Sequence, residues 1–529
     1  MASYINEPTD NSNYVEGEIV DDVASVENGL PMASDGDSQS LRSADKPHGK
    51  RPTPWEPSGN TWKDFFHFVG PGWFVCIAYV DPGNFQADIQ AGSTARYSLL
   101  FMLWWTSLLS IYVQILCVRL AYYGQVTLAE VQARDTPNNY IRYLNWFISE
   151  VSTVITDLPE VIGIGIALKI FFGWPYYAGV ALSLVTTLLF LASLNTGMKS
   201  LEKIIFLFVA TMAITLFVEM SFVKPDWGSL IKGWTYGFTE ISSSDLFSLT
   251  GILGSVVMPH NLHLHTATCQ SRPVKRDINI IKKAVKYASW EPVIPIMISF
   301  CVNVAVTTIA AERVYGTDNA DTVGLTNFCN YFQVLKGGCI LWGISLLAAG
   351  QSSAITTTFT GQYIMNGFLN IQLPVAVRAI ITRLVAITPS VIISALFTNK
   401  LNIMVSFVNS MIGLLLPFAF TPLVKYNCSK VYMGEYASKG VERWTLYTFA
   451  VIVYFVNAYS LSAQGGGFFG DFLADMEPSP KKGFYIFLQV LIQLFYFTWN
   501  AYCILSPVTV PMTPLTEARP YDPQFALAN

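Results

Sequence analysis

Apolar segments of about 20 residues or more recur along most of this sequence, and they constrain the fold more than any other feature. A helix of that length crosses the roughly 30 Å of hydrocarbon in a lipid bilayer. Only 13% of the 529 residues are charged and 52% are hydrophobic, whereas a soluble domain has about 25% charged residues. We therefore predict an all-α polytopic membrane protein and exclude a water-soluble multidomain enzyme.

About twelve membrane-spanning helices are expected from this length rule. They cover residues 65–92, 97–123, 147–171, 174–195, 202–223, 245–269, 286–312, 337–366, 376–398, 401–424, 443–463 and 484–508. The segment before them, residues 1–60, is first acidic and then rich in proline, and it has too few large apolar groups to bury a core. We expect it to be a disordered tail.

Lysine and arginine concentrate in alternate connections between the expected spans, and this asymmetry sets the orientation. The connection at 272–286 is the richest of them, and it could also bind anionic lipid. We therefore expect both termini in the cytoplasm, and no glycan on the sequon at Asn427, which falls on that side. The net charge of -4 shows no basic excess, so nucleic acid is excluded as a partner. Plasma, endosomal and vacuolar membranes all remain open.

The eight cysteines lack a CxxC motif or the framework of a secreted protein, so most are expected to be small core residues. Cys329 and Cys339 are different because both fall near one predicted outer loop. Either a disulfide or two free thiols would be consistent with this spacing.

Two of the expected spans are interrupted near their middle by polar and helix-breaking residues. The first span contains Asp81-Pro82-Gly83-Asn84, and the sixth contains Met258-Pro259-His260-Asn261. Proline removes a backbone donor and glycine permits unwinding, so a discontinuous helix is expected at each site. Because the two breaks lie five spans apart, the second copy is reversed in the membrane. This arrangement is typical of inverted-repeat secondary transporters, which bind substrate between discontinuous helices.

The chemistry available at these two breaks favours a divalent transition metal. Asp81 supplies an anionic oxygen, Asn84 an amide oxygen and Met258 a soft thioether, and unwound carbonyls add further oxygens. Magnesium and calcium prefer shells made only of oxygen, whereas a thioether favours softer ions. We interpret Met258 as a selectivity filter. The alternatives are that Met258 is a packing residue and that Asp81 marks a loop between two short helices.

The sequence resembles the NRAMP family of proton-coupled divalent-metal transporters, first through the residues of these two breaks. The likeness continues through three more motifs: Asp157-Leu158-Pro159-Glu160-Val161-Ile162-Gly163 in the third span, Ala349-Gly350-Gln351-Ser352-Ser353 with Gly361-Gln362-Tyr363 in the eighth, and Leu416-Pro417-Phe418-Ala419 in the tenth. It extends from about Phe65 to the tenth span. The last two spans and both tails carry little of it.

The resemblance implies a LeuT-like fold of two inverted five-helix repeats with two peripheral helices. The repeats would cover residues 61–225 and 226–428, the peripheral helices 429–508, and a cytoplasmic tail 509–529. The metal ligands it implies are Asp81, Asn84, Met258, the carbonyls of Ala78 and Ser255, and Asn409. Two positions depart from the family pattern. Ser255 replaces a small apolar residue, and Leu415 replaces a glutamine, which could alter gating or metal hydration.

Acids in the third span are candidates for the proton path. Glu150, Asp157 and Glu160 are spaced by seven and three residues, which places them near one helical face. The resemblance assigns such acids, together with Arg383 and the metal ligand Asp81, to proton coupling. The alternative is a buried ion-pair network that only fixes helix packing.

Three histidines, His260, His263 and His265, cluster in the sixth span and could suggest zinc. No H-E-x-x-H pattern supplies a glutamate base, so a catalytic zinc site is disfavoured. The resemblance places His260 and His265 on the transport path and puts His263 where an aromatic residue is more usual.

The function expected from all this is proton-coupled transport of manganese, ferrous iron or cadmium into the cytosol by alternating access. The chain would be a monomeric transport unit and no enzyme, with divalent ions, protons and lipid as its partners and with the transported Mn²⁺ or Fe²⁺ in place of any cofactor. A metal-sensing membrane receptor is the alternative from another class, and an intramembrane metalloenzyme is a third.

Overall fold

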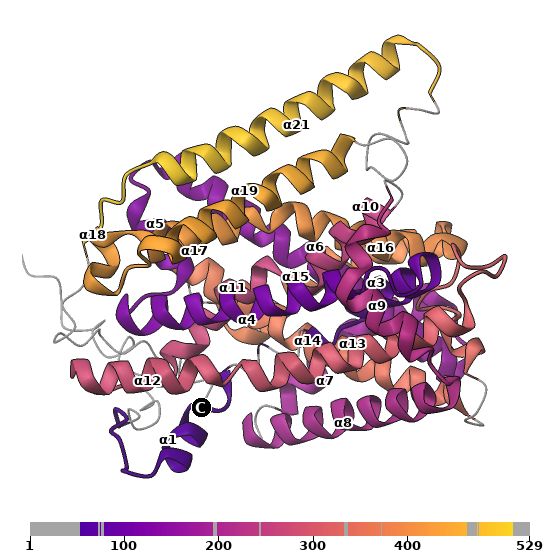
Figure 1. Ribbon diagram of the computed structural model, residues 1–529, viewed down its shortest axis with the longest axis horizontal. Coiled ribbons are helices and arrows are strands. Elements are labelled where there is room, and N and C mark those ends of the chain that lie inside the picture. The colour runs from indigo at the N-terminus through magenta and orange to yellow at the C-terminus, as the bar shows by residue number, and fades with distance from the viewer. Residues whose placement is uncertain are drawn as a thin grey trace, which may run out of the picture. The chain divides into compact units, whose positions relative to one another are not determined.

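The computed structural model describes residues 53–71, 75, 79–193, 198–242, 245–332, 337–371, 373–462, 473 and 476–511. Most of the expected N-terminal tail, the end of the C-terminal tail and Ala78 lie outside the described residues. The described chain is built from α-helices (Figure 1), and its only strand-like pairing is an isolated bridge between Trp55 and Val274.

The helices follow the order expected from the apolar segments. The segment 61–225 contains α1 (Thr61–Phe68), α3 (Pro82–Ala95), α4 (Leu100–Tyr123), α5 (Leu128–Asp135), α6 (Asn139–Phe172), α7 (Tyr176–Ser193) and α8 (Met198–Val223). The segment 226–428 contains α9 (Trp227–Tyr236), α10 (Leu246–Val256), α11 (Pro259–Gln270), α12 (Ile278–Trp290), α13 (Val293–Arg313), α14 (Gly338–Leu369), α15 (Val375–Leu396), α16 (Leu401–Leu415) and α17 (Pro417–Cys428). After these come α18 (Lys430–Met433), α19 (Gly440–Ser462) and α21 (Pro480–Leu505).

Each expected span overlaps a helix or a pair of helices separated by a break. Within the described residues, seven helices are long and apolar enough to cross a membrane on their own. The first and sixth spans are divided into helices of 8 to 14 residues, which are too short to cross a membrane singly. The all-α, multi-pass fold class predicted from the sequence is confirmed.

Helices distant in sequence pack directly against one another in the bundle. The closest partners are α6 with α14, α3 with α13, and α10 with α16. Two glycines permit these approaches. A Cβ on Gly92 would lie 2.3 Å from the carbonyl oxygen of Thr307, and one on Gly254 would lie 2.1 Å from that of Asn409. Small residues at helix interfaces are the common device for close packing in membranes, where burial of apolar surface gives little drive.

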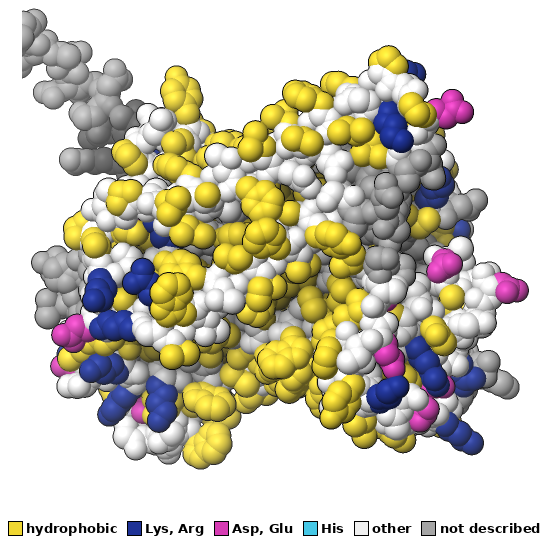
Figure 2. All heavy atoms as spheres, turned by 45° about the horizontal axis from the view of Figure 1, so that its top comes forward, with side chains coloured by type: hydrophobic (Ala, Val, Ile, Leu, Met, Phe, Trp, Pro, Cys, Tyr) yellow, Lys and Arg dark blue, Asp and Glu magenta, His cyan; other side chains and the backbone are white. Residues whose placement is uncertain are grey.

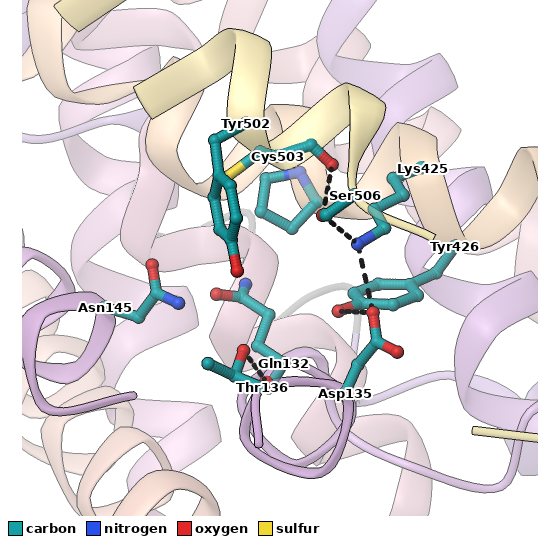
Figure 3. Close-up of a pocket in the computed structure, with 10 residues that line it drawn as sticks. Gln132, Asp135, Thr136, Asn145, Lys425, Tyr426, Tyr502, Cys503 and Ser506 are labelled. Carbon is teal, nitrogen blue, oxygen red and sulfur yellow. Dashed lines mark hydrogen bonds and ion pairs between the residues drawn. The ribbon is translucent and has the colours of Figure 1, made fainter. Parts of the chain in front are cut away.

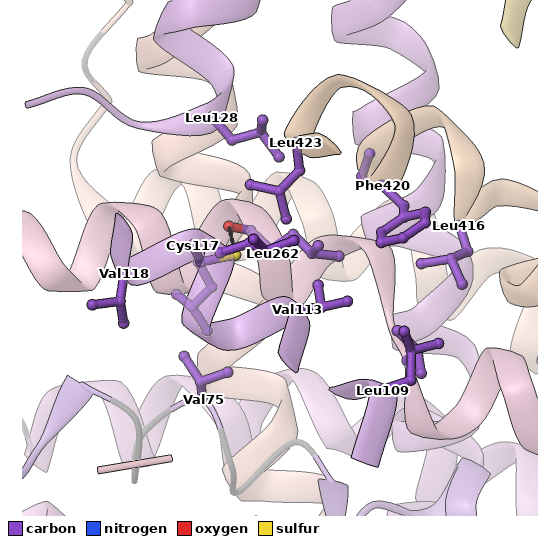
Figure 4. Packing of buried hydrophobic residues seen from close by; sticks show 14 of the residues in the cluster. Val75, Leu109, Val113, Cys117, Val118, Leu128, Leu262, Leu416, Phe420 and Leu423 are labelled. Carbon is purple, nitrogen blue, oxygen red and sulfur yellow. Dashed lines mark hydrogen bonds between the residues drawn. The ribbon is translucent and has the colours of Figure 1, made fainter. Parts of the chain in front are cut away.

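A large apolar cluster joins α4, α11 and α17 (Figure 4). Val113 and Cys117 of α4 lie among Leu262 of α11 and Phe420 of α17, all of them buried. The Cys117 thiol also donates to the Leu262 carbonyl across 3.7 Å. Dispersion contacts of this kind are individually small and collectively large, and they hold α11 in place below the break.

The outer surface fits a lipid environment. On the face in Figure 2, hydrophobic side chains cover the middle, and lysine, arginine and acidic side chains gather toward two ends. On α21, Phe484, Phe487 and Leu494 are more than half exposed. Such a helix would be costly to expose to water and is suited to hydrocarbon.

The two ends of the bundle differ in their polar contacts. At one end, Lys282 of α12 lies 5.8 Å from the ring of Tyr436, and Arg119 of α4 pairs with Glu442 of α19 at 2.6 Å. At the other end, Arg96 pairs with Glu312 at 3.4 Å. A disulfide joins Cys329 to Cys339 just beyond α13, so the first of the two alternatives for these cysteines holds.

Polar side chains around a small pocket attach the segment after α21 to the rest of the bundle (Figure 3). The Asp135 carboxylate accepts hydrogen bonds from Lys425 at 3.0 Å, from the Tyr426 hydroxyl at 3.2 Å and from the Thr509 backbone at 2.7 Å. Lys425 also donates to the Ser506 hydroxyl at 2.9 Å. Because both charged groups are buried and paired, this cluster fixes α5, α17 and the end of α21 together.

Candidate metal-binding site

The first break is organised by Asp81, which caps α3. Asp81 has an extended backbone (φ −113°, ψ 168°), and its carboxylate accepts from the Asn84 backbone N–H at 2.6 Å. The Asn84 side-chain amide donates to the same oxygen at 3.0 Å. Pro82 occupies the first helical position, where its missing N–H costs nothing. Asp81, Pro82 and Asn84 together therefore start a helix inside the bundle.

The second break separates α10 from α11 at Met258. Its backbone is extended (φ −79°, ψ 130°), and Pro259 is the first residue of α11. In a continuous helix the donor to the Ser255 carbonyl would be the residue four positions later, which is Pro259 and has no N–H. The Ser255 hydroxyl donates back to Ile252 at 3.2 Å. The carbonyl of Ser255 is thus left available. Ala78 has the same spacing from Pro82, although it lies outside the described residues.

Asn409 of α16 reaches the first break directly. Its side-chain amide donates to the Gly83 carbonyl at 2.7 Å. A Cβ placed on Gly83 would lie 2.8 Å from Asn409 Oδ1 and 3.3 Å from Asp81 Oδ1. The two oxygens therefore converge beside Gly83, which has no side chain to separate them.

Met258 lies in the same region of the bundle. It is buried and packs with Val408 and Ile412 of α16 and with Ile155 and Leu158 of α6. Val408 precedes Asn409 in the chain, and Leu158 precedes Pro159, whose Cβ lies 3.6 Å from the position of a Cβ on Gly83. Met258 thus packs against the same segments of α6 and α16 that supply Pro159 and Asn409 to the first break.

Two amide oxygens in this region have no hydrogen-bond partner among the described residues. They are Asn84 Oδ1 and Asn409 Oδ1, and both are buried. Leaving such an acceptor unpaired costs about 1–3 kcal/mol. Two unpaired oxygens next to a carboxylate and near a thioether match the mixed hard and soft donor set expected for a transition-metal cation.

Helix α6 supports the first break through the third-span motif. A Cβ on Gly163 would lie 2.5 Å from Pro82 Cγ, so only glycine lets α6 approach that proline. A Cβ on Gly350 of α14 would lie 2.9 Å from the Glu160 carbonyl oxygen. The motif glycines therefore fix the distances between α3, α6 and α14.

A buried ion-pair cluster lies on the same stretch of α6. Arg383 of α15 contacts Asp157 at 2.9 Å and Glu160 at 3.5 Å, and all three side chains are fully buried. Thr357 of α14 donates to Asp157 at 2.8 Å, and Ser353 donates to Glu160. The structure brings together three of the residues expected on the proton path.

Glu150 does not join this cluster. It pairs instead with Arg378 at the start of α15 and accepts from Trp146 at 3.2 Å. Sequence reasoning missed Arg378. The signal was present, because Arg378 lies five residues before Arg383 in the same apolar span. A second cation in such a span requires an acidic partner.

The histidines of α11 have separate environments. His265 shares a 2.6 Å hydrogen bond with Gln114, which donates to the Tyr79 hydroxyl at 2.7 Å, and Ser110 donates to the same hydroxyl at 2.5 Å. The ring nitrogens of His260 and His263 have no partner among the described residues. Within the described residues, no group of three or more His, Cys, Asp or Glu side chains lies close enough together to hold a metal ion. Sequence reasoning also missed this series of hydrogen bonds from His265 through Gln114 to Tyr79.

These features define a class of protein: a multi-pass helical membrane protein in which two helices are interrupted and present carboxylate, amide and thioether side chains at their breaks. A family model described as natural resistance-associated macrophage protein-like matches residues 72–463. The chain is 35% identical over 462 residues to Metal transporter Nramp2 of Populus trichocarpa, covering 82% of this chain and 85% of the relative. It is 36% identical over 412 residues to Metal transporter Nramp3 of Arabidopsis thaliana, covering 76% and 80%. The chain belongs to the Nramp family of metal transporters.

Solved structures agree with this assignment. A manganese transporter of Eremococcus coleocola matches with a TM-score of 0.73 and 25% identity, covering 85% of this chain and 97% of that one. Mhp1, a nucleobase-cation symporter, matches with a TM-score of 0.51 and 13% identity, covering 82% and 93%, which supports the fold alone. The predicted LeuT-like fold and the predicted family are confirmed.

Replacing Gly83 with alanine tests the convergence of Asp81 and Asn409. The new Cβ would lie 2.8 Å from Asn409 Oδ1, so the amide must move away from the break. We expect Gly83→Ala to weaken Mn²⁺ binding roughly tenfold or more, because losing only ~1.4 kcal/mol of binding free energy raises the Kd tenfold. Titration of the purified protein with Mn²⁺ measures it.

Gly483→Ala is the matched control, because a Cβ on this glycine of α21 meets nothing within 4 Å. It should bind Mn²⁺ as the unmodified protein does. Equal affinity for Gly83→Ala and Gly483→Ala would show that the oxygens beside Gly83 do not hold the ion.

Proposed function

We propose that this metal transporter is a proton-coupled secondary transporter that carries manganese, ferrous iron or cadmium into the cytosol by alternating access. The observation that carries the proposal is the convergence of Asp81, Asn84 and Asn409 at one helix break, with Met258 at the other. The metal ion is the cargo, and the proposal requires no resident cofactor. Because one chain supplies the whole ligand set, the transport unit is a monomer.

Selectivity in this proposal comes from the thioether of Met258. Asp81 offsets part of the cation's charge, and the amide oxygens of Asn84 and Asn409 replace part of its hydration shell. A site made only of oxygens would favour calcium or magnesium, whereas the sulfur improves binding of softer ions. The carbonyls of Ser255 and Ala78 complete the shell.

Alternating access needs the bundle to open on each side in turn, and the breaks at Asp81 and Met258 supply the hinges. At the end that carries α12, the segment before α1 closes the bundle. The Trp55 N–H donates to the Pro273 carbonyl at 2.8 Å, and the Lys275 N–H donates to the Trp55 carbonyl at 3.1 Å. Glu56 pairs with Lys275 at 3.0 Å. Opening of this end would have to break these contacts.

Proton coupling is assigned to the acids that join the metal site to the rest of α6. Asp157 and Glu160 share Arg383, and loss or gain of one proton would change the net charge of this buried cluster. Asp81 would exchange a proton for the metal ion. Glu150, His260 and His265 extend the path toward the end that carries α12.

Two features support the proposal that this end faces the cytoplasm. The first is the basic connection 272–286, which leads into α12 at this end. The Cys329–Cys339 disulfide lies at the opposite end, as expected for an oxidising compartment. Both termini would then be cytoplasmic. The membrane would be the plasma, endosomal or vacuolar membrane.

Asp81→Asn should abolish uptake of Mn²⁺ into proteoliposomes. The substitution keeps the shape of the side chain but removes the charge that offsets a divalent cation. The control is Asp321→Asn, which removes an exposed carboxylate from the connection after α13. We expect the control to transport normally. Uptake by Asp81→Asn at the control's rate would contradict the assigned ligand.

Met258→Leu should reduce discrimination between Mn²⁺ and Ca²⁺. Leucine has a similar volume and no sulfur, so the side chain still packs against Val408 and Ile412. Competition of Ca²⁺ with Mn²⁺ uptake measures the effect, and Met212→Leu is the control because Met212 is equally buried in another cluster. If Ca²⁺ competes no better against Met258→Leu than against Met212→Leu, the thioether is not the filter.

Glu160→Gln should lower the ratio of proton flux to metal flux. Glutamine can still accept from Ser353, but it cannot release a proton. Metal-driven acidification of proteoliposomes, divided by Mn²⁺ uptake, gives this ratio. A purely structural network would instead lower both fluxes together and leave the ratio unchanged. Glu312→Gln, at the Arg96 pair, serves as the control.

A further inference from the structure

Asp88 is a second buried carboxylate on α3 that the metal site does not use. It follows Asp81 by seven residues, so it lies on nearly the same face of the helix, about two turns further along. At a rise of 1.5 Å per residue, the two positions are about 10 Å apart. Both side chains are 1% exposed. Asp88 therefore lies beyond Asn84 in the direction of the bundle end that carries Arg96.

The surroundings of Asp88 are polar although they are buried. Asn303 of α13, with its amide NH₂ turned toward the carboxylate, donates to Asp88 Oδ2 at 3.3 Å and to the Ser299 carbonyl at 3.3 Å. One turn further, Gly92 of α3 approaches Thr307 of α13, whose hydroxyl is buried and has no partner in the described chain. Asp88, Asn303 and Thr307 thus form a polar seam between α3 and α13.

The Asp88 carboxyl group has no basic partner within the described residues. No lysine, arginine or histidine lies within 4.0 Å of it, and the same holds for Asp81. In contrast, Asp157, Glu160 and Asp135 each have a basic partner. A carboxyl group inside a membrane bundle without a basic partner is costly to ionise, and such groups are usually functional.

We propose that Asp88 is a second cation station, which attracts the divalent ion as it passes between the Arg96 end of the bundle and the Asp81 site. This inference rests on the proposed function. A purely structural role does not require the charge, because an asparagine at position 88 could hydrogen-bond Asn303 without the cost of a buried carboxylate. The seam offers only oxygen ligands, so this station attracts divalent ions in general and leaves discrimination to Met258.

Asp88→Asn tests the charge with little change of shape. A carboxylate about 10 Å from a doubly charged ion acts strongly in a medium of low dielectric constant, so we expect the KM for Mn²⁺ uptake to rise roughly tenfold or more. The KM for Cd²⁺ should rise by a similar factor. The Vmax should stay within about twofold, because the substitution weakens capture and leaves the Asp81 site intact. Asp321→Asn, which removes an exposed carboxylate from the connection after α13, should leave the KM unchanged.

The charge swap Asp88→Asn with Asn303→Asp moves the carboxylate from α3 to α13 and keeps the pair. It should restore the KM to near that of the unmodified protein, and this variant decides the question even if Asp88→Asn alone does not fold. A KM that is unchanged in Asp88→Asn, or that stays high in the swap, would overturn the proposal. The proposed function fails separately, if the unmodified protein takes up no Mn²⁺.

Discussion

A helix can begin inside a membrane-spanning bundle only if its first backbone N–H groups find acceptors, and Asp81 meets that requirement for α3. Its carboxylate accepts from Asn84 N–H at 2.6 Å, and Pro82 removes one of the donors that would otherwise need a partner. The same acid is the proposed metal ligand. The group that makes the break possible therefore also gives the break its charge, and the structure of the site and its function depend on one side chain.

Close packing by glycines then brings the other proposed ligands toward Asp81. Gly83 of α3 leaves room for Asn409, Gly163 of α6 leaves room for Pro82, and Gly254 of α10 leaves room for the backbone of α16. Each contact would be blocked by a single Cβ. Because interfaces packed this closely have few alternative arrangements, small tilts of α3 or α10 would be transmitted to α6 and α16. The ion pairs of Arg383 lie on the same α6, so a change of charge there acts on a helix that already contacts the first break.

Much of this could be predicted from the sequence, because both breaks depend on local chemistry. An extended residue followed by proline recurs at Asp81 and Met258, and both were expected to interrupt their helices. Proline alone is a weaker signal. Leu416 before Pro417 keeps helical angles (φ −52°, ψ −46°), and that span continues without unwinding. At the two true breaks, in contrast, polar or small residues stand next to the proline within an apolar run.

The remaining contacts depend on tertiary packing and could not be read from local patterns. The pairing of Glu150 with Arg378, the link from His265 to Tyr79 and the Asp135 cluster all join helices that are distant in sequence. Asn409 was expected only from family resemblance, because nothing in its own segment marks it as a ligand. Asp88 carried a usable signal, its spacing of seven residues from Asp81, but its neutral partner on α13 becomes visible only in the fold.

The most direct test of the central claim is anomalous diffraction from crystals of this protein soaked in Mn²⁺. The account predicts one strong peak within about 2.6 Å of side-chain oxygens of Asp81 and Asn84, with the sulfur of Met258 also in contact. A peak at His260 and His263 instead, or crystals in which Asp81 and Met258 point away from a common ion, would contradict it.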